Sequence, residues 1–514
     1  MEFTSKTIAV SAPEWDTQRK RIRLSRALLG GTSAMQKAGI EYLPMRSGET
    51  ADEYADRIDR SVLVNYFKMT TNYLAGQVFQ KQVSYEKEGE GKTPEYDSAF
   101  FDLFKEDTDT QGTNLTMFCK QVFCEGLTDG VAFILSDYPH IQLSKDEGGR
   151  TLYKDAAGEW KPRTAQADAE NGWRPYWVLI KASQVLDAWL DSSGGKTVLR
   201  AFRYVETLQR EKEDGTRETV KRIRAISPDQ WEVWEATKDG EYERKDGGKN
   251  SLGVVPVDWF MPGEQVGATE DNEGTPGLTA TPALDDLAEM NRAHWQGYSD
   301  HKSLMAYGRA PVWLLKMLGG VESDQPIQFG PSRCCSSQNE HASIESIGVE
   351  PASIDRSFQD LKGMEDYMGL YGLQLIMPKN AGVTATQAQI SAASSDATLK
   401  GWVQKLKDCM ENALRKIALW QGGKDGPALF INQEFRIPYS EAITQHLAGL
   451  VEKGLFSLRA FFETLKKMGL YEDTDFEGYK QELQETRAFL RENQLTEFTP
   501  GFGRFPEDGQ HNTQ

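Results

Sequence analysis

The side chains able to bind metals or act as nucleophiles are few, and their spacing does not match known sites. Two of the six histidines, His294 and His301, lie seven residues apart on one predicted helix, and no pair has the His-Glu-x-x-His spacing of a zinc site. The five cysteines, sparse and odd in number, are Cys119, Cys124, Cys334, Cys335 and Cys409. None of their spacings fits a zinc ligand set, and they favour a reducing compartment. We interpret the adjacent pair at 334 and 335 as free thiols.

Two Gly-Lys-Thr triplets, at 91–93 and 195–197, have the ending of a phosphate-binding loop. The glycine required five residues earlier is replaced by Glu86 in the first case and by Leu190 in the second. No Gly-x-Ser-x-Gly motif occurs. Adjacent acids such as those at 285 and 286 suit the first turn of a helix, where the dipole favours negative charge. The sequence therefore predicts a protein that is not an enzyme, with no cofactor and no metal centre.

The chain has 514 residues, of which 39% are hydrophobic and 10% aromatic. These figures predict about two to four packed regions rather than one core or a disordered chain. The 59 Lys and Arg against 77 Asp and Glu give a formal net charge of −18. Proteins that bind nucleic acid by neutralising phosphates are expected to be basic, so that class is disfavoured. No apolar run is long enough for a membrane span, and the start lacks the pattern of a secretory signal.

Any site would be positioned by the helices and strands predicted from the sequence. The first part of the chain, to about residue 276, is predicted to be a mixed α and β region. Apolar residues at three- and four-residue spacing predict helices over Glu53–Gln82 and Asn114–Leu127, and the run Val131–Ser136 predicts a buried strand. Alternating patterns predict further strands at Trp173–Ile180, Val198–Leu208, Lys221–Ile226 and Gln230–Ala236. The region is therefore expected to be α+β with much antiparallel sheet.

In the next region, the sequence pattern predicts two helices with a small β-rich segment between them. Thr281 can cap the first helix, which is expected to end near Tyr307, and the second is expected over 352–375. After the loop 377–383, Thr384 opens a capping box, and no stop signal follows until Gly422. This long helix has an apolar stripe in its second half and a glycine at 401 where it can kink.

Beyond the long helix, the pattern predicts one strand within 428–437 and amphipathic helices over 440–490, followed by a disordered tail. A helix of this length needs a partner along most of its apolar face. Neighbouring copies in a cyclic ring would provide such a partner through repeated head-to-tail contacts. The residues predicted to pack in this way are Trp402, Leu406, Ile417 and Trp420.

Five stretches of this sequence resemble the portal proteins, or head–tail connectors, of tailed bacteriophages. The stretches are residues 41–81, 118–139, 281–316, 384–422 and 454–471. None contains a catalytic signature, and their joint order supports the resemblance. It implies an α+β, portal-type fold with a mixed α/β wing, a helical stem, a small β-rich clip, a long kinked helix and a helical C-terminal crown. The implied regions are the wing (1–276), stem helices (277–307 and 352–376), clip (308–351), tunnel loop (377–383), long helix (384–421), return to the wing (422–437), crown (438–495) and flexible tail (496–514).

The resemblance also implies a function. Portal proteins form rings, of twelve copies in general, at one capsid vertex, where double-stranded DNA passes during packaging and ejection without sequence-specific recognition. The implied partners are other copies of the chain, the terminase large subunit, tail adaptor proteins and the major capsid protein. The implied location is the virion, after assembly in the cytoplasm of the host bacterium. The terminase ATPase is a separate polypeptide, which agrees with the missing phosphate loop.

Within the implied tunnel loop, Lys379 and Asn380 are the candidates for contact with DNA in the channel. Lys379 is the only cation of that loop. The acidic composition gives the remaining wall a physical role, because a negative surface repels the DNA phosphates and lets the duplex slide.

Two other readings are compatible with the sequence. Another phage structural protein, such as a minor capsid or baseplate component, would have the same acidity and the same lack of motifs. A hydrolase that uses paired carboxylates in the α+β region is a third hypothesis, and it predicts a compact particle with a deep pocket.

Overall fold

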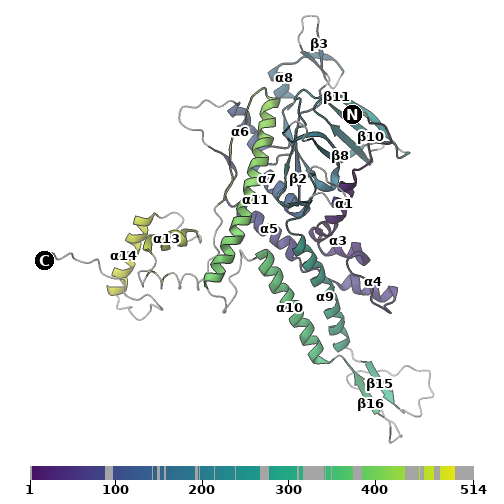
Figure 1. Cartoon of the computed structure of the whole chain (residues 1–514), viewed down its shortest axis with the longest axis vertical. Coiled ribbons are helices and arrows are strands. Elements are labelled where there is room, and N and C mark those ends of the chain that lie inside the picture. Colours follow the sequence, from purple (N-terminus) through teal and green to yellow (C-terminus); the bar gives the residue numbers. More distant parts are fainter. Residues whose placement is uncertain are drawn as a thin grey trace, which may run out of the picture. The chain divides into compact units, whose positions relative to one another are not determined.

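The computed structural model describes residues 3–86, 96–141, 143–146, 151–155, 158–191, 195, 197–212, 215–237, 239–266, 277–309, 312–316, 341, 343–348, 350–373, 385–433, 448, 451, 457–467 and 475–492. The chain forms two compact units (Figure 1). Unit 1 consists of Met1–Ser25, Met69–Asp285 and Leu373–Gln514, and unit 2 consists of Arg26–Lys68 and Asp286–Gly372. Each unit therefore combines segments that are far apart in the sequence.

Unit 1 contains a three-stranded antiparallel sheet with β2 (Ala132–Asp137) at its centre. This strand pairs with β6 (Tyr176–Lys181) on one side and with β12 (Val257–Phe260) on the other. Its first five side chains are all buried, as expected for a strand whose apolar residues occupy successive positions. Two helices pack on this sheet, α7 (Leu115–Asp129) and α11 (Ala385–Trp420).

A second antiparallel sheet of unit 1 has five strands that follow one another in chain order. They are β7 (Val185–Asp191), β8 (Val198–Glu211), β9 (Arg217–Ile226), β10 (Gln230–Ala236) and β11 (Tyr242–Lys249). The turns that join β8 to β9 and β10 to β11 contain Gly215 and Gly240, with φ values of 75° and 83°. Only glycine adopts such angles readily, so these residues allow the tight hairpins.

The main core of unit 1 joins both sheets to the N-terminal helix α1 (Pro13–Arg21). Trp15 of α1 packs edge-on against Phe133 of β2, with ring centroids 5.7 Å apart. Phe133 in turn packs against Phe202 of β8 at 5.1 Å. All three side chains are almost completely buried. Burial of such large rings makes a major contribution to the stability of the fold.

The junction between α7 and β2 shows why a glycine is required there. Asn114 caps α7 by accepting the N–H of Met117 at 2.9 Å, and the helix ends at Gly130 with a φ of 81°. A Cβ at this glycine would lie only 2.7 Å from the carbonyl oxygen of Ala280. The side-chain amide of Gln18 donates to the carbonyls of Asp129 and Ala280, each at 2.8 Å. Three distant segments are thus joined through backbone carbonyls.

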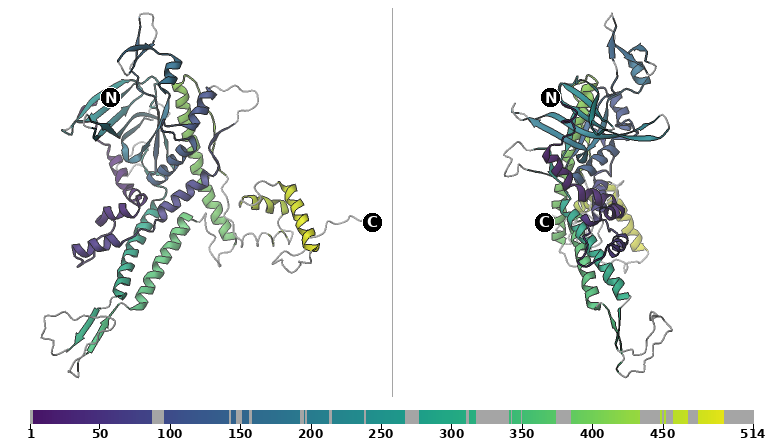
Figure 2. Two further views of the ribbon diagram at one scale, coloured as in Figure 1. Left: turned by 180° about the vertical axis from the view of Figure 1, so that it is seen from behind. Right: turned by 90° about the vertical axis from the view of Figure 1, so that its right-hand side faces the viewer.

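Unit 2 contains a pair of long helices, α9 (Asp285–Arg309) and α10 (Pro351–Leu373). Between them in the chain, β15 (Val312–Lys316) pairs antiparallel with β16 (Ser343–Ile347), which gives a small β hairpin at the ends of the helices (Figure 2). A Cβ at Gly297 of α9 would lie 3.3 Å from Leu361 of α10. The glycine therefore permits a close approach of the two helices.

The remaining elements complete both units. The helices are α2 (Arg23–Leu29), α3 (Gly31–Ala38), η1 (Gly39–Glu41), α4 (Ala51–Arg60), α5 (Tyr66–Val78), α6 (Ser98–Glu106), α8 (Ala165–Glu170), η2 (Ala182–Gln184), α13 (Leu458–Lys467) and α14 (Phe476–Glu492). The strands are β1 (Ser84–Tyr85), β3 (Leu143–Lys145), β4 (Thr151–Lys154), β5 (Trp160–Pro162), β13 (Glu264–Gln265), β14 (Ala280–Thr281) and β17 (Leu429–Phe430). Among the helices described, none is both long and apolar enough to cross a membrane.

The α+β class is confirmed, as are most of the predicted elements. The helix–β–helix order after residue 281 and the long helix are present, the latter with 36 residues. The predicted helix Glu53–Gln82 is wrong as a single element, because residues 61–65 separate α4 from α5. Asn65 explains the break: its side chain accepts the N–H of Lys68 and donates to the carbonyl of Leu28. The predicted strand at 428–437 is only β17 within the described residues, where it pairs with β1.

Candidate functional site

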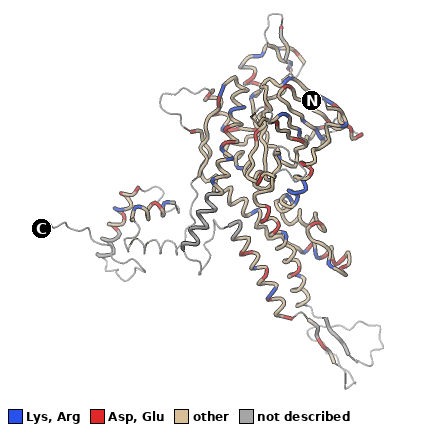
Figure 3. Tube along the Cα trace, in the orientation of Figure 1, with Lys and Arg blue, Asp and Glu red and all other residues tan. Residues whose placement is uncertain are grey.

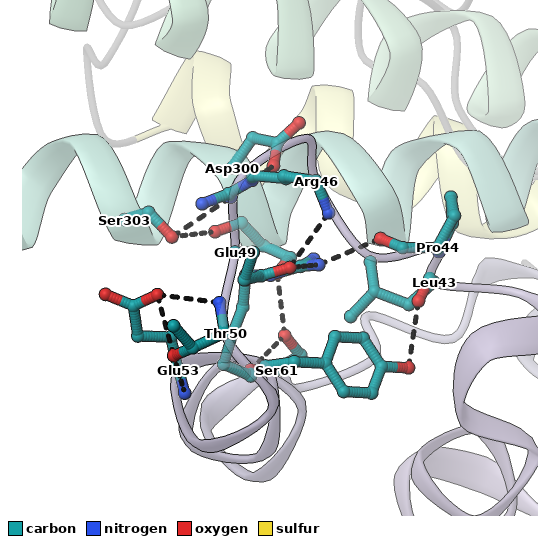
Figure 4. Close-up of polar contacts among 12 residues, drawn as sticks. Leu43, Pro44, Arg46, Glu49, Thr50, Glu53, Ser61, Asp300 and Ser303 are labelled. Carbon is teal, nitrogen blue, oxygen red and sulfur yellow. Dashed lines mark hydrogen bonds and ion pairs between the residues drawn. The ribbon is translucent and has the colours of Figure 1, made fainter.

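Polar side chains of unit 2 gather where the segment 43–50 and α4 meet α9, and we call this group the α9 cluster (Figure 4). Its members are Arg46, Glu49, Thr50, Glu53, Arg57, Ser61, Ser299, Asp300 and Ser303. The local sequence positions α4 within it. Thr50 accepts the N–H of Glu53 at 3.3 Å, and the Glu53 carboxylate accepts the N–H of Thr50 at 2.9 Å. This capping box starts the helix, and these hydrogen bonds to Thr50 lower the pKa of Glu53.

The strongest contact of the α9 cluster is the ion pair between Arg57 and Glu49. Arg57 donates to the two carboxylate oxygens of Glu49 at 2.6 and 2.7 Å, and both side chains are only 7% exposed. The guanidinium also donates to the carbonyl of Pro44 at 2.8 Å. The hydrogen bonds from Arg57 lower the pKa of Glu49 to about 2, and the same pair raises the pKa of Arg57. This bidentate pair fixes the 43–50 segment on α4.

Three further contacts attach the segment 43–50 and the end of α4 to α9. Arg46 donates from Nε to Asp300 at 3.0 Å and from its terminal nitrogen to Ser303 at 3.1 Å, and its N–H donates to Glu49. Ser61 and Ser299, both buried, share a hydrogen bond of 2.8 Å. The hydrogen bonds of the α9 cluster thus fix the orientation of α9 relative to α4 and the segment 43–50.

The pairing of α9 with α10 also uses polar side chains. His294 Nε2 lies 3.2 Å from Glu365 Oε1, and His301 Nδ1 lies 3.1 Å from Ser357 Oγ. His294 is completely buried, and burial lowers its pKa, with Glu365 acting in the opposite direction. The two histidines face α10 and each contacts a side chain there. Among the described residues, no group of three or more His, Cys, Asp or Glu side chains could hold a metal ion.

The four residues predicted to pack between copies all lie on α11, against its own unit. Leu406 and Ile417 have no exposed surface in the single chain, because α11 lies on β2 and β12 of its own unit. Trp420 is partly buried and donates from Nε1 to the carbonyl of Ser136 at 3.0 Å, and Trp402 is also partly buried. The burial of this half of α11 therefore requires no second copy. A contact of Trp402 or Trp420 with a neighbouring copy stays a prediction.

A buried ion pair holds α11 on the sheet and was not identified from the sequence. Lys416 Nζ donates to Asp258 Oδ1 at 2.7 Å and to the carbonyl of Val257 at 2.8 Å, and the two side chains are 17% and 10% exposed. Burial raises the pKa of Asp258, while Lys416 acts in the opposite direction. A lysine on a mostly apolar helix face was the only signal available in the sequence.

Of the remaining candidate residues, those that the structure describes include no activated group. Burial raises the pKa of Cys119 and Cys409, and raises that of Cys124 to about 11, so these thiols are poor nucleophiles. The predicted channel residues Lys379 and Asn380 lie outside the described residues, as do the cysteines at 334 and 335.

Comparisons with known proteins add three findings. Residues 283–421 match the family model described as "Domain of unknown function (DUF4055)". This stretch extends from just before α9 to just after α11. No curated protein matches the chain.

Among solved structures, one similar chain comes from the "Neck of empty GTA particle computed with C6 symmetry". It is 11% identical, with 79% of this chain and 90% of that chain covered and a TM-score of 0.36. Another comes from the "Virion of native gene transfer agent (GTA) particle", at 11% identity, coverage of 79% and 89%, and a TM-score of 0.33. Both TM-scores are below 0.5, so neither likeness supports a conclusion about this protein.

Proposed function

We propose that this protein is a structural component of a tailed phage or phage-like particle and, within that class, a portal protein. The observation on which the proposal rests is the arrangement of unit 2. Two long helices, α9 and α10, are joined through the β15–β16 hairpin, and the next described element in the chain is the 36-residue helix α11. This order agrees with the stem, clip and long helix that the sequence resemblance implies.

The exposed surface of the helix pair supports association with other copies. Tyr307 of α9 and Phe358 and Tyr367 of α10 are 59%, 57% and 67% exposed. Large aromatic side chains on the surface of a long helix pair are typical of interfaces. In a ring, such helices would line up around the axis, and each copy would cover part of its neighbour.

The proposed task is the passage of double-stranded DNA through the ring without sequence recognition. The formal net charge of −18 for each copy makes the ring as a whole repel phosphates, which favours sliding over binding. Lys379 and Asn380 are proposed to contact the duplex, with Lys379 as a cation in an otherwise acidic channel. Terminase, tail adaptors and the major capsid protein are the proposed partners, and the virion is the proposed location.

Negative-stain microscopy and native mass spectrometry of the purified full chain test this proposal. A closed ring with an axial channel is the expected result. Rods or plates would favour another structural component of the particle, such as a minor capsid or baseplate protein. A compact particle without a channel, stable as a monomer at all concentrations, would contradict the proposal.

A further inference from the structure

Helix α10 packs on α9 with one of its faces. Ser357 and Glu365 contact the two histidines of α9, and Leu361 lies opposite Gly297 of that helix. The other side of α10 is largely exposed and contains charged residues of both signs (Figure 3). This exposed side is therefore accessible to a second chain.

Four charged residues on the exposed side of α10 lack a partner in their own chain. They are Asp355, Arg356, Asp360 and Lys362, all of them exposed. Arg356 and Asp360 are four residues apart, a spacing at which opposite charges can pair on a helix, yet they form no ion pair. Among the residues that the structure describes, none contributes a hydrogen bond or an ion pair to any of these four side chains.

Helical geometry places the four charges on two opposite flanks of α10. Counted at about 100° per residue from Leu361, Asp355 and Lys362 lie about 100–120° to one side. Arg356 and Asp360 lie about 100–140° to the other side. Towards the C-terminus, the first flank is negative and then positive, and the second flank is positive and then negative. Each charge on one flank therefore has an opposite charge at nearly the same height, within about 3 Å, on the other flank.

This pattern suits copies that are related by rotation. Copies in a cyclic ring differ by a rotation without a shift along the axis, so equivalent residues lie at equal heights. For helices that run along the axis, one flank of α10 then faces the other flank of α10 in the next copy. Opposite charges face each other at both positions of such a contact, and like charges face each other at neither.

We propose that α10 of one copy packs beside α10 of the next copy through these flanks. Asp355 pairs with Arg356 of the next copy. Lys362 pairs with Asp360 of the next copy. This inference rests on the proposed ring and names a contact that closes it.

Two uncharged residues fit the same contact. Phe358 is 57% exposed and lies between the two charges of the first flank, so the next copy would cover its ring at the centre of the contact. On the side of the second flank, a Cβ at Gly363 would meet no atom of its own chain within 4 Å. The packing of the single chain therefore does not require this glycine, and its missing side chain leaves room for the neighbouring helix.

Charge exchange within one flank of the full chain tests the contact. The first variant has Asp355→Lys and Lys362→Glu, and the second variant has Arg356→Glu and Asp360→Lys. Each keeps the formal net charge of −18 but places like charges opposite each other at both positions. The protomer concentration needed for rings is therefore expected to rise at least about tenfold in each variant.

Restored complementarity provides the second part of the test. The variant with all four substitutions again has opposite charges at both positions, and it is expected to form rings at the wild-type concentration. An equimolar mixture of the two variants has complementary flanks at every interface of an alternating ring with an even number of copies. This mixture is also expected to form rings.

Native mass spectrometry measures the assembly, and circular dichroism verifies that each variant is folded. The matched control is Lys37→Glu with Asp59→Lys, which exchanges two exposed charges of unit 2 outside α10 at the same net charge. It is expected to leave the ring unchanged. An equal loss of rings in this control would assign the effect to charge exchange in general and would overturn the inference.

The remaining outcomes separate this contact from the proposed function. If each variant forms rings as readily as the wild type, then the flanks of α10 do not meet in the ring, and this inference alone is overturned. Folded variants that fail to assemble when mixed, or when all four substitutions are combined, would also overturn it. A wild-type chain that never forms a ring would overturn the proposed function and this contact together.

Discussion

Unit 1 and unit 2 each fix a long helix, but by different means. The C-terminal half of α11 in unit 1 buries Leu406 and Ile417 completely on the sheet, with the pair Lys416–Asp258 at one edge. In unit 2, α9 also buries Leu287, Ala288 and Trp295 completely. In addition, charged and polar side chains contact it or the segment beside it, among them the Arg57–Glu49 pair, the Arg46–Asp300 contact and His294.

The difference predicts different responses to solution conditions. Apolar burial is non-directional and depends little on pH, so α11 is expected to stay in place over a wide range. Charge-assisted hydrogen bonds fix the orientation of a helix because they require defined distances and angles between the two groups. They weaken when one of the two groups changes its protonation state. The stability of unit 2 is therefore expected to depend more strongly on pH than that of unit 1.

The largest effect is expected from removing apolar volume under α11. Ile417→Ala leaves a cavity at a completely buried site and is expected to lower the free energy of unfolding by about 2–5 kcal/mol. Urea denaturation of the full chain, monitored by tryptophan fluorescence, measures this change. The control Leu419→Ala, on the same helix at a side chain 38% exposed, is expected to cost less than about 1 kcal/mol. Equal costs for the two variants would show that α11 is not packed as described.

The next effect concerns the α9 cluster. Glu49→Gln removes the charged acceptor of Arg57 in a site where both side chains are nearly buried, which is expected to cost about 1–3 kcal/mol of local stability. Faster hydrogen exchange in peptides that cover α4 and the segment before it measures the loss. Because the folded pKa of Glu49 is about 2, below its ordinary 4.5, this stabilisation is present above pH 4.5 and is lost as the pH falls towards 2.

A matched variant sharpens the previous test. Asp56→Asn removes the exposed ion pair with Arg60, in which both side chains are more than 70% exposed. Its effect on exchange in α4 is expected to correspond to less than about 0.5 kcal/mol. A larger effect of Asp56→Asn than of Glu49→Gln would contradict the role given to the buried pair.

A smaller effect is expected from His294. Its folded pKa is lowered by burial, so the unfolded chain takes up a proton first as the pH falls below about 6.5. Stability of the α9–α10 pair is therefore expected to be full above this pH and to decrease between it and the lower folded value. The groups facing His294 are Glu365 of α10, Tyr298 of α9 and Tyr66 of α5. Hydrogen exchange of α9 peptides at pH 7 and pH 5.5 measures the change.

His294→Asn is expected to remove this pH dependence. The control His140→Asn changes a half-exposed histidine of unit 1 and is expected to leave it unchanged. An unaltered pH dependence in His294→Asn would assign the effect to another group.

The smallest structural effect is expected from Lys379→Ala. This residue is proposed to contact only DNA, so native mass spectrometry is expected to show an intact ring, with at most a change in packaging. Loss of the ring would contradict its placement in a channel loop.

Local patterns in the sequence were sufficient for most elements of the fold. The alternation in Gln230–Ala236 predicted β10, and the apolar stripe from Leu406 to Ile417 predicted the buried face of α11. The stripe shows that a face is covered, but it does not show whether the same chain or another copy covers it. Leu406 and Ile417 are already buried within the single chain, and their packing between copies stays a prediction that this burial does not support.

The parts that could not be predicted depend on contacts between distant residues. The break after α4 depends on the hydrogen bond from the side chain of Asn65 to the carbonyl of Leu28. The start of α5 depends on the side chain of Asn291, which accepts the N–H of Phe67. Likewise, Arg46 and Asp300 are 254 residues apart in the sequence. A polar residue shows no preference for one distant partner until the fold brings the two together. The contact between Arg46 and Asp300 therefore left no local pattern, whereas the Thr50–Glu53 capping box of the same cluster is a local one.

The position of β2 at the centre of its sheet has a consequence for biosynthesis. Its neighbours β6 and β12 are translated later, and the hydrogen bond from Ser136 to the carbonyl of Ala413 joins residues 277 positions apart. Although α7 and β6 are close to β2 in the chain, the contact of β2 with α11 cannot form until residues 385–420 have been translated. Contacts between such distant residues favour slow folding, so we expect the emerging chain to be prone to aggregation before its covering helix arrives.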